Sequence, residues 1–271
     1  MARVVLVSGA SSGLGLSCAR ELATRGDTVF GTSRTARHDD GGVTMLAMDV
    51  DDDDSVARAV ATVLERSGRI DAVVNNAGFG FAGALEDTST AEARAQLETN
   101  VIGVLRVCRA VLPHMRRAGR GHIVNVSSLA GRIALPYQGM YSASKFALAG
   151  LTASLRHELA ADGIRVAMVE PGDFKTGFTA ARRLTAASGS ESVHHDALRR
   201  TLAIVERDEA GGADPIVFAR TIARLLDDPS PPLRTSCGHT SQRFAAWLHD
   251  RVPDPIAERV VRRLYAVPRR R

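Results

Sequence analysis

The chain has 271 residues, of which 45% are hydrophobic and 24% charged, and its formal net charge is +5. This length is common for one large α/β domain, and no stretch with the composition of a linker interrupts residues 1–271. No window approaches the ~20 consecutive apolar residues of a membrane span, and the N-terminus enters an apolar run without a charged leader. The sequence therefore predicts one domain without a membrane span, in a soluble and cytoplasmic protein.

The residue types that often bind metals are scattered. Cys18, Cys108 and Cys237 are far apart in the chain, and two of them lie in apolar helical patterns. This is typical of buried thiols in a reducing compartment rather than of disulfides or metal ligands. The adjacent His194 and His195 would point in different directions on a helix, so we predict no metal site there.

Positive charge gathers near the end of the chain, at Arg262, Arg263, Arg269, Arg270 and Arg271. A solvated tail is the simplest interpretation. A basic tail can also contact nucleic acid or an acidic membrane surface, but neither a recognition motif nor interleaved aromatic residues accompany this one. We therefore expect no nucleic-acid partner.

Short apolar runs alternate with helical patterns along the chain. Runs that are apolar at every position predict strands buried on both faces, as in a parallel sheet. We expect strands near residues 3–8, 28–33, 43–48, 70–75, 122–127 and 164–169, and a further one near 233–237. The fold class is therefore α/β, with a doubly wound parallel sheet of six to seven strands and helices on both faces. Ligands of such sheets bind at the carboxyl ends of the strands.

The first predicted strand runs into a glycine-rich loop and then into a helix that begins near Leu16. Glycine lets the backbone turn tightly and approach a pyrophosphate, whose charge is favoured by the free N–H groups at a helix start. The loop consists of Ser8, Gly9, Ala10, Ser11, Ser12, Gly13, Leu14 and Gly15. Further along, the acidic run 51–54 suits the N-terminus of the next helix.

Tyr141 and Lys145 are four residues apart in an expected helix, and Ser128 follows the apolar run 123–126. Residues at this spacing share one helix face, so an ammonium group would lie beside the phenol. A nearby cation favours the phenolate, and we expect Lys145 to lower the pKa of Tyr141 from its usual ~10. Tyr141 would then act as a general acid or base, with Ser128 bonded to the substrate oxygen.

Together these motifs resemble the short-chain dehydrogenase/reductase family. The resemblance covers residues 3 to about 180, and the ending, at 231–234 and Gly238, is more loosely similar to the retinoid and steroid branch. It implies a single-domain Rossmann fold with a cofactor half at about 1–120, a catalytic and substrate half at 121–271, and a lid at about 177–212. The matching positions are the glycine loop, Asn75 to Gly78, Asn100, Ser128, Tyr141 with Lys145, and Pro171-Gly172 followed by Thr176.

The second strand ends at Ser33 and Arg34, where NAD-preferring sites place an acidic residue. An arginine there offers charged donors to a 2′-phosphate, with Ser11, Ser12 and Arg37 near it. We therefore predict NADP(H), although a solvent-exposed arginine after a strand is also common. The resemblance further implies cofactor contacts from Asp49, Val50, Asn76, Ala77, Gly78, Tyr141, Lys145, Pro171, Gly172, Phe174 and Thr176. For Asp49, capping of the following helix is the alternative.

The resemblance implies hydride transfer between nicotinamide and a carbonyl or carbinol carbon. Tyr141 would exchange the proton, Ser128 would hold the oxygen, Lys145 would bind the ribose and Asn100 would order a relay water. Members of this family usually form homodimers or homotetramers, through the helices that carry residues 100–115 and 141–159 here. The substrate walls would come from Leu135, Pro136, Gln138, Met140, Phe79, Phe81, Phe174 and Phe178.

This mostly apolar wall predicts a large apolar carbonyl or alcohol substrate, although each of these residues is equally compatible with core packing. Two other functional classes remain open from the sequence. One is a lyase, isomerase or cyclase that uses Tyr141 and Ser128 without net redox change. The other is a cofactor-binding regulator, which is disfavoured because every catalytic position holds the reactive residue type.

Overall fold

The computed structural model describes residues 2–35 and 38–267. Its centre is a parallel sheet of seven strands in the order β3-β2-β1-β4-β6-β7-β9. The strands are β1 (Val4–Val7), β2 (Thr28–Ser33), β3 (Val43–Ala47), β4 (Ala72–Asn75), β6 (Gly121–Val126), β7 (Ile164–Pro171) and β9 (Arg234–Cys237). The predicted doubly wound α/β fold is confirmed, and the seventh strand is present.

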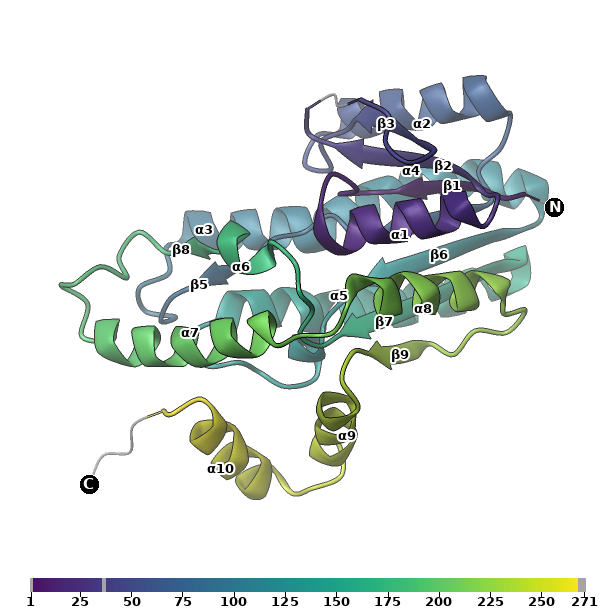
Figure 1. The fold of residues 1–271 in the computed structure, drawn as a ribbon. Helices are drawn as coiled ribbons and strands as arrows, with labels where there is room; N and C mark the ends of the chain where they lie inside the picture. The colour runs from purple at the N-terminus through teal and green to yellow at the C-terminus, as the bar shows by residue number, and fades with distance from the viewer. Residues whose placement is uncertain (1, 36–37, 268–271) are drawn as a thin grey trace.

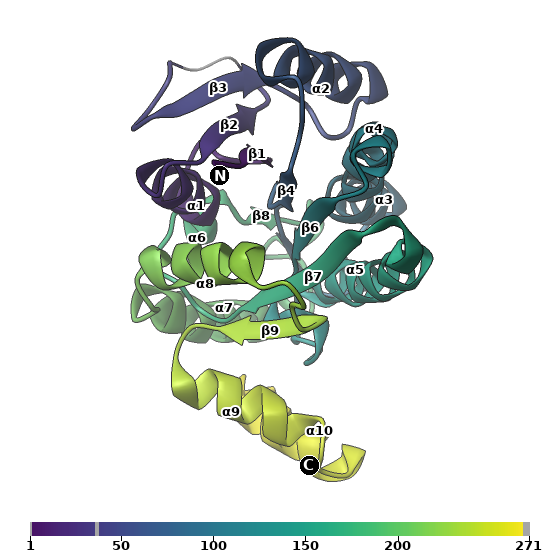
Figure 2. The same ribbon diagram turned by 90° about the vertical axis from the view of Figure 1, so that its right-hand side faces the viewer.

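Helices cover both faces of this sheet (Figure 2). One face carries α1 (Gly13–Thr24) and α8 (Pro215–Asp227), and the other carries α2 (Asp53–Ser67), α4 (Gly103–Ala118) and α5 (Gly139–Glu158).

The first strand shows why both layers form. Val5 and Val7 belong to the apolar cluster under α1 and α8, whereas Val4 and Leu6 belong to the cluster under α2, α4 and α5. Since alternate side chains of a strand point to opposite faces, an uninterrupted apolar run supplies two cores at once.

Beyond the carboxyl ends of the strands lies a smaller layer (Figure 1). It contains α3 (Thr90–Leu97), α6 (Phe178–Ala181), α7 (His195–Ala210) and a two-stranded parallel sheet of β5 (Phe81–Ala82) and β8 (Arg183–Leu184). The pairing of β5 with β8 was not expected from the sequence, because strands of two residues show no alternation of apolar and polar positions. Residues 178–184 and α7 fall within the predicted lid, whose mobility stays a prediction.

The chain ends in two helices, α9 (Thr240–His249) and α10 (Asp254–Leu264), which extend past the β9 edge of the sheet (Figures 1 and 2). Within the described part of the chain, no helix combines the length and apolar character needed to cross a membrane. Of the terminal arginines, Arg269, Arg270 and Arg271 lie outside the described residues, as does Arg37.

Two local expectations hold. The helix α2 begins behind Asp52, whose side chain accepts a hydrogen bond from the Ser55 backbone N–H at 3.0 Å, with Asp53 and Asp54 in the first turn. The acidic run therefore does stabilise a helix N-terminus. All three cysteines are free and buried, as predicted.

We expect Gly15→Ala to lower the free energy of unfolding by about 1–3 kcal/mol, the usual cost of overpacking. A Cβ on Gly15 would lie 2.3 Å from the Gly9 carbonyl oxygen, which is backbone and cannot move aside alone. Gly189→Ala is the matched control, because a Cβ there meets nothing within 4 Å and the position has no positive φ, so alanine should add up to about 1 kcal/mol. Equal urea midpoints for the two variants would contradict the packing argument.

Candidate active site at the carboxyl ends of the strands

A cleft of about 490 Å³ runs along the carboxyl ends of β1, β4, β6 and β7. Ser128, Tyr141 and Lys145 line it, together with every residue predicted to contact the cofactor. The cofactor set comprises Gly9, Ser11, Ser12, Gly13, Leu14, Gly15, Ser33, Arg34, Asp49, Val50, Asn76, Ala77, Gly78, Tyr141, Lys145, Pro171, Gly172, Phe174 and Thr176. Motifs spread over more than half of the chain thus converge on one cavity.

The glycine loop is fastened to the segment after β4. The Ser8 hydroxyl oxygen accepts hydrogen bonds from the backbone N–H groups of Asn76 and Ala77, both at 3.0 Å. In return the Asn76 amide donates to the carbonyls of Ser8 and Gly9 at 3.0 Å. Gly9 has φ +66°, and a Cβ on it would lie 2.8 Å from the Ala77 Cα. Only glycine therefore permits this approach.

Ser33, the last residue of β2, and Arg34 also line the cleft. The Ser33 hydroxyl donates to the Thr35 carbonyl at 2.6 Å. Arg34 is exposed, and it makes no hydrogen bond or ion pair with any residue among 2–35 and 38–267. A guanidinium with unused donors at this position suits an anionic group.

Asp49 also lines the cleft, and its carboxylate accepts from the Asp51 backbone N–H at 3.1 Å. The alternative interpretation of Asp49 as the helix cap is wrong, because Asp52 fills that position. One carboxylate oxygen of Asp49, Oδ1, is thus held by the turn that follows it.

Tyr141 and Lys145 share one face of α5, as their spacing predicts. The Lys145 Nζ lies 5.7 Å from the centre of the Tyr141 ring and donates to the Val126 carbonyl at 2.9 Å. A hydrogen bond joins Ser128 to Tyr141. The phenol ring packs against Phe178, with ring centroids 5.9 Å apart.

Burial controls the acidity of this pair, contrary to the expectation that Lys145 lowers the pKa of Tyr141. Burial raises the pKa of Tyr141 to about 12, against the opposing effect of the Ser128 hydrogen bond. Burial also lowers the pKa of Lys145 to about 8. Both shifts have one cause, since each charged form loses hydration. The phenol is therefore a proton donor at neutral pH.

Asn100 does not line the cleft but lies directly behind it. It was expected within a helix, and it lies in a π-helical turn, Glu98–Ile102, between α3 and α4. Its amide bonds to both backbone groups of Phe79 and donates to the Ser144 hydroxyl at 3.0 Å. A Cβ on Gly78 would lie 3.1 Å from the Asn100 Oδ1 and 3.8 Å from the Lys145 Nζ, so the two polar groups flank the same glycine.

The expected substrate walls are partly present. Phe79, Leu135, Gln138, Phe174 and Phe178 line the cleft, whereas Pro136, Met140 and Phe81 do not. No motif indicated six further lining residues, because they reach the cleft only through the packing of the last hundred residues. These are Asp173, Arg183, Val205, Asp208, Glu209 and Tyr265.

These six residues add charged side chains to the apolar lining of the cleft. Burial raises the pKa of Asp173 to about 6, with Gln242 bonded to its carboxylate. Arg183 lies over the ring of Phe79, 4.3 Å from its centre. The cleft therefore combines aromatic walls with charged groups at its rim.

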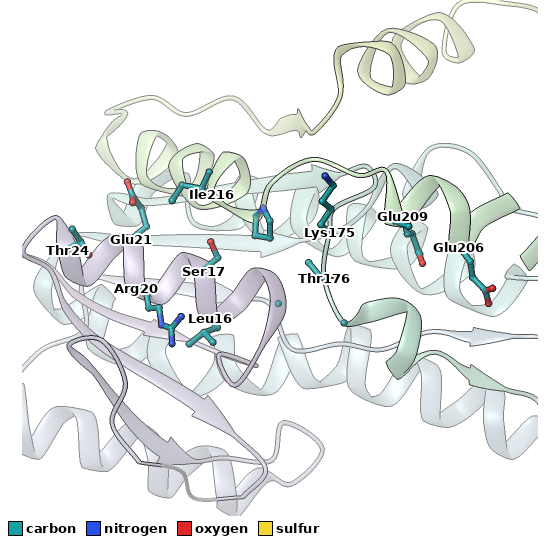
Figure 3. Close-up of a pocket in the computed structure, with 14 residues that line it drawn as sticks. Leu16, Ser17, Arg20, Glu21, Thr24, Lys175, Thr176, Glu206, Glu209 and Ile216 are labelled. Carbon is teal, nitrogen blue, oxygen red and sulfur yellow. The ribbon is translucent and has the colours of Figure 1, made fainter. Parts of the chain in front are cut away.

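A second hollow, of about 920 Å³, adjoins the cleft along the outer side of α1 (Figure 3). Its lining includes Leu16, Ser17 and Arg20 of α1 together with Lys175 and Ile216. The candidate catalytic residues Ser128, Tyr141 and Lys145 are not among its lining residues. The chemistry therefore belongs to the first cleft.

The adjacent histidines, His194 and His195, each contact an oxygen atom in the layer beyond the sheet. His194 Nε2 lies 2.6 Å from a Glu86 carboxylate oxygen, and His195 Nδ1 lies 3.4 Å from the Ser188 carbonyl. In residues 2–35 and 38–267, no group of three or more histidine, cysteine or acidic side chains is arranged to hold a metal ion.

Two curated relatives are similar over nearly the whole chain. A 3-ketodihydrosphingosine reductase from Bacteroides thetaiotaomicron is 40% identical, over 98% of both chains. Retinol dehydrogenase 8 from Bos taurus is 34% identical, over 96% of this chain and 88% of the relative. The second similarity agrees with the looser likeness of the ending to the retinoid branch.

Solved structures extend the similarity to the fold. A short-chain dehydrogenase from Streptomyces avermitilis superposes with a TM-score of 0.84 at 33% identity, covering 96% of each chain. An alcohol dehydrogenase from Thermococcus sibiricus complexed with 5-hydroxy-NADP has a TM-score of 0.72 at 26% identity, covering 89% of this chain and 97% of that one. A short-chain dehydrogenase/reductase from Burkholderia phymatum in complex with NAD has a TM-score of 0.77 at 25% identity, covering 92% and 93%.

The structural neighbours thus include proteins with either nicotinamide cofactor, and they do not decide between NAD and NADP. A protein-family model described as short chain dehydrogenase matches residues 3–187. Taken with the relatives and the sheet order, this match means that the chain belongs to the short-chain dehydrogenase/reductase family of oxidoreductases.

Proposed function

We propose that this protein is an NADP(H)-dependent ketoreductase or alcohol dehydrogenase that acts on a mostly apolar carbonyl or secondary alcohol. The observation that carries the proposal is the convergence of Ser128, a protonated Tyr141 and the glycine loop on one cleft. The relative named 3-ketodihydrosphingosine reductase supports reduction of a ketone.

The residues present fit a dinucleotide cofactor. Gly9 and Gly15 bring bare backbone to the start of α1, where free N–H groups favour a pyrophosphate. At the end of β2 the chain offers Arg34 and lacks a carboxylate that would repel a 2′-phosphate. Lys145, Thr176 and the backbone after Pro171 would hold the nicotinamide half.

When bound, NADP(H) would supply the hydride for reduction or accept it in oxidation. Tyr141 donates its proton to the carbonyl oxygen during reduction, and Ser128 holds that oxygen by a hydrogen bond. Charge develops on the oxygen only in the transition state, so these donors lower the barrier rather than merely binding the substrate. Lys145 offsets the negative charge left on Tyr141, and Asn100 positions the proton path behind Gly78.

The substrate is proposed to be apolar near the reacting carbon. Phe79, Leu135 and Phe178 supply aromatic and aliphatic surface, and burying a large apolar group there contributes about 25 cal/mol per Å². The names of the two curated relatives, a ketosphingoid reductase and a retinol dehydrogenase, support this substrate class.

We further propose a homodimer or homotetramer that pairs through α4 and α5. Leu105 on α4 and Phe146 on α5 expose 39% and 45% of their surface. Small residues on α5, including Ala143, Ala147 and Gly150, allow a second helix to approach closely.

Arg34→Asp is expected to weaken NADPH binding by roughly 10- to 100-fold, since charge-assisted hydrogen bonds to the phosphate are lost and repulsion replaces them. NADH binding should change little. Calorimetric titration with each cofactor measures both, and Arg58→Asp, an exposed charge reversal on α2 outside the cleft, is the control. Equal losses for NADPH and NADH would show that Arg34 does not select the phosphate.

Tyr141→Phe is expected to reduce hydride transfer by roughly 10²- to 10⁴-fold, the usual contribution of general acid catalysis. The aromatic ring and its packing against Phe178 remain, so NADPH affinity should stay near that of the native protein. The test follows NADPH consumption with a panel of apolar ketones. Substrate turnover without net NADPH consumption would favour the lyase or isomerase class instead, and full activity in the variant would remove Tyr141 from the reaction.

Ketone reduction is expected to fall as pH rises through about 8, where buried Lys145 loses its proton. Below this pH the ammonium offsets the developing phenolate, and above it that stabilisation disappears. Tyr141 itself stays protonated throughout, because its pKa is raised to about 12. The pH profile of kcat under saturating NADPH measures this, and a profile that stays flat well above pH 8 would contradict the role of Lys145.

A further inference from the structure

The net positive charge of the protein comes from one end of the chain. Residues 1–239 contain equal numbers of basic and acidic side chains, 27 of each. Residues 240–271 contain eight arginines and only three acidic residues, so they account for the whole net charge of +5. Two helices, α9 and α10, make up most of this segment and extend past the β9 edge of the sheet (Figure 2).

The first of these helices exposes a large aromatic surface. Phe244, Trp247 and Leu248 are 59%, 48% and 41% exposed, and their spacing of three and four residues places them on one face of α9. The rings of Phe244 and Trp247 stack with centroids 5.7 Å apart. The guanidinium of Arg251 lies 4.1 Å from the centre of the Trp247 ring, which puts a cation directly on the aromatic surface.

The second helix exposes an aliphatic row. Ile256, Val260 and Leu264 recur every four residues along α10 and are 52%, 49% and 60% exposed. Arg259 and Arg263, each adjacent to a member of this row, are exposed and make no ion pair with any residue that the structure describes. The buried face of α10 is a different one, which contains Ala257.

Six of the thirteen large hydrophobic side chains that the structure exposes therefore lie within residues 244–264, and unpaired arginines accompany them. A helix with aromatic and aliphatic residues on one side and arginines beside them is the pattern of segments that lie in a bilayer interface. Arginine near an anionic leaflet and tryptophan at headgroup depth are both favourable.

Other occupants fit this surface less well. A second copy of the chain would bring another segment with five net positive charges against this one. Nucleic acid would match the charge and could stack on Phe244 and Trp247, but it would leave the exposed row of Ile256, Val260 and Leu264 without a partner, because aliphatic side chains cannot stack on bases. An anionic lipid surface satisfies both the charge and the apolar row.

We propose that α9 and α10 together form a docking surface for an anionic lipid bilayer, on which the protein lies without spanning it. Cations on the segment contact the headgroups, and the two exposed rows enter the interface.

The docking surface is joined to the active-site cleft on two sides. The Gln242 Oε1 of α9 accepts from the Asp173 backbone N–H at 3.0 Å, directly after Pro171-Gly172. Tyr265, at the end of α10, lines the cleft, and its carbonyl accepts from the Thr201 hydroxyl of α7 at 3.0 Å. Docking would place the cleft beside the lipid phase, a consequence that rests on the proposed apolar substrate, whereas docking itself does not.

The test uses the intact protein and two kinds of vesicle, phosphatidylcholine alone and phosphatidylcholine mixed with phosphatidylglycerol. We expect co-flotation with the mixed vesicles only, weakened by added salt. Trp247 is the single tryptophan of the chain, so its emission should shift to the blue and become shielded from an aqueous quencher when the surface inserts. Absence of binding, equal binding to both vesicles, or bound protein with unchanged Trp247 emission would each overturn the proposal.

Two double variants separate the contribution of the arginines to vesicle binding from that of the apolar row. Arg259→Gln with Arg263→Gln should weaken binding to the mixed vesicles roughly thirtyfold, given the usual gain per basic residue near an anionic leaflet. Val260→Ser with Leu264→Ser should weaken binding and reduce the Trp247 shift. The matched controls are Arg58→Gln on α2 and Val217→Ser on α8, both exposed and distant in sequence from the surface. Losses as large in the controls would contradict the assignment.

Vesicle binding requires no turnover, so it is independent of the proposed function. Tyr141→Phe should bind vesicles like the native protein while losing hydride transfer. If native protein fails to bind and the Val260→Ser, Leu264→Ser variant changes the sedimentation coefficient, the surface is a self-association face and the lipid proposal is wrong.

Discussion

The contact between the loop after β1 and the loop after β4 is the constraint on which the site depends. A single hydroxyl, that of Ser8, satisfies two backbone N–H groups, and the Asn76 amide returns two hydrogen bonds to the glycine loop. A Cβ on Gly78, two residues on, would lie 3.1 Å from the Asn100 Oδ1 and 3.8 Å from the Lys145 Nζ, so both groups lie against this glycine. Asn100 bonds in turn to Phe79 and to Ser144, the residue before Lys145, and these contacts link the glycine loop to Lys145.

Burial sets the protonation of Tyr141 and Lys145, the pair proposed to carry the chemistry. A phenol and an amine removed from water both favour their neutral forms, so the phenol holds its proton at neutral pH. A reaction that leaves negative charge on Tyr141 then gains most from a cation close by, because the low-dielectric surroundings strengthen that attraction as they weaken hydration. Lys145 would therefore act by stabilising the phenolate that forms on Tyr141 during the reaction, and not by keeping Tyr141 ionised beforehand.

Sequence alone predicted the strands well, because runs such as Val4–Val7 and 166–169 are apolar at every position, which is typical of parallel strands that are buried on both faces. It also predicted that the motifs after the parallel strands meet at one edge of the sheet, and these motifs do line one cleft there. It missed β8 and the π-helical turn at Asn100, where the local pattern does not differ from that of a loop or an ordinary helix. That Tyr265 and Glu209 line the cleft could not be predicted from the sequence, because only the packing of the last helices brings them there.

The helix α9 is held against the segments that follow Ser128 and Pro171 at the cleft. Arg132, in the segment after Ser128, pairs with buried Glu170 of β7 and with Asp250 at the end of α9, each at 2.7 Å. A Cβ on Gly172 would lie 2.3 Å from the Gln242 Oε1, so a larger residue at this position would displace the Gln242 side chain of α9 from the Asp173 backbone N–H. A displacement of α9 would consequently move groups on both sides of the substrate end of the cleft. Any partner that holds this helix pair acts on the cleft through these contacts.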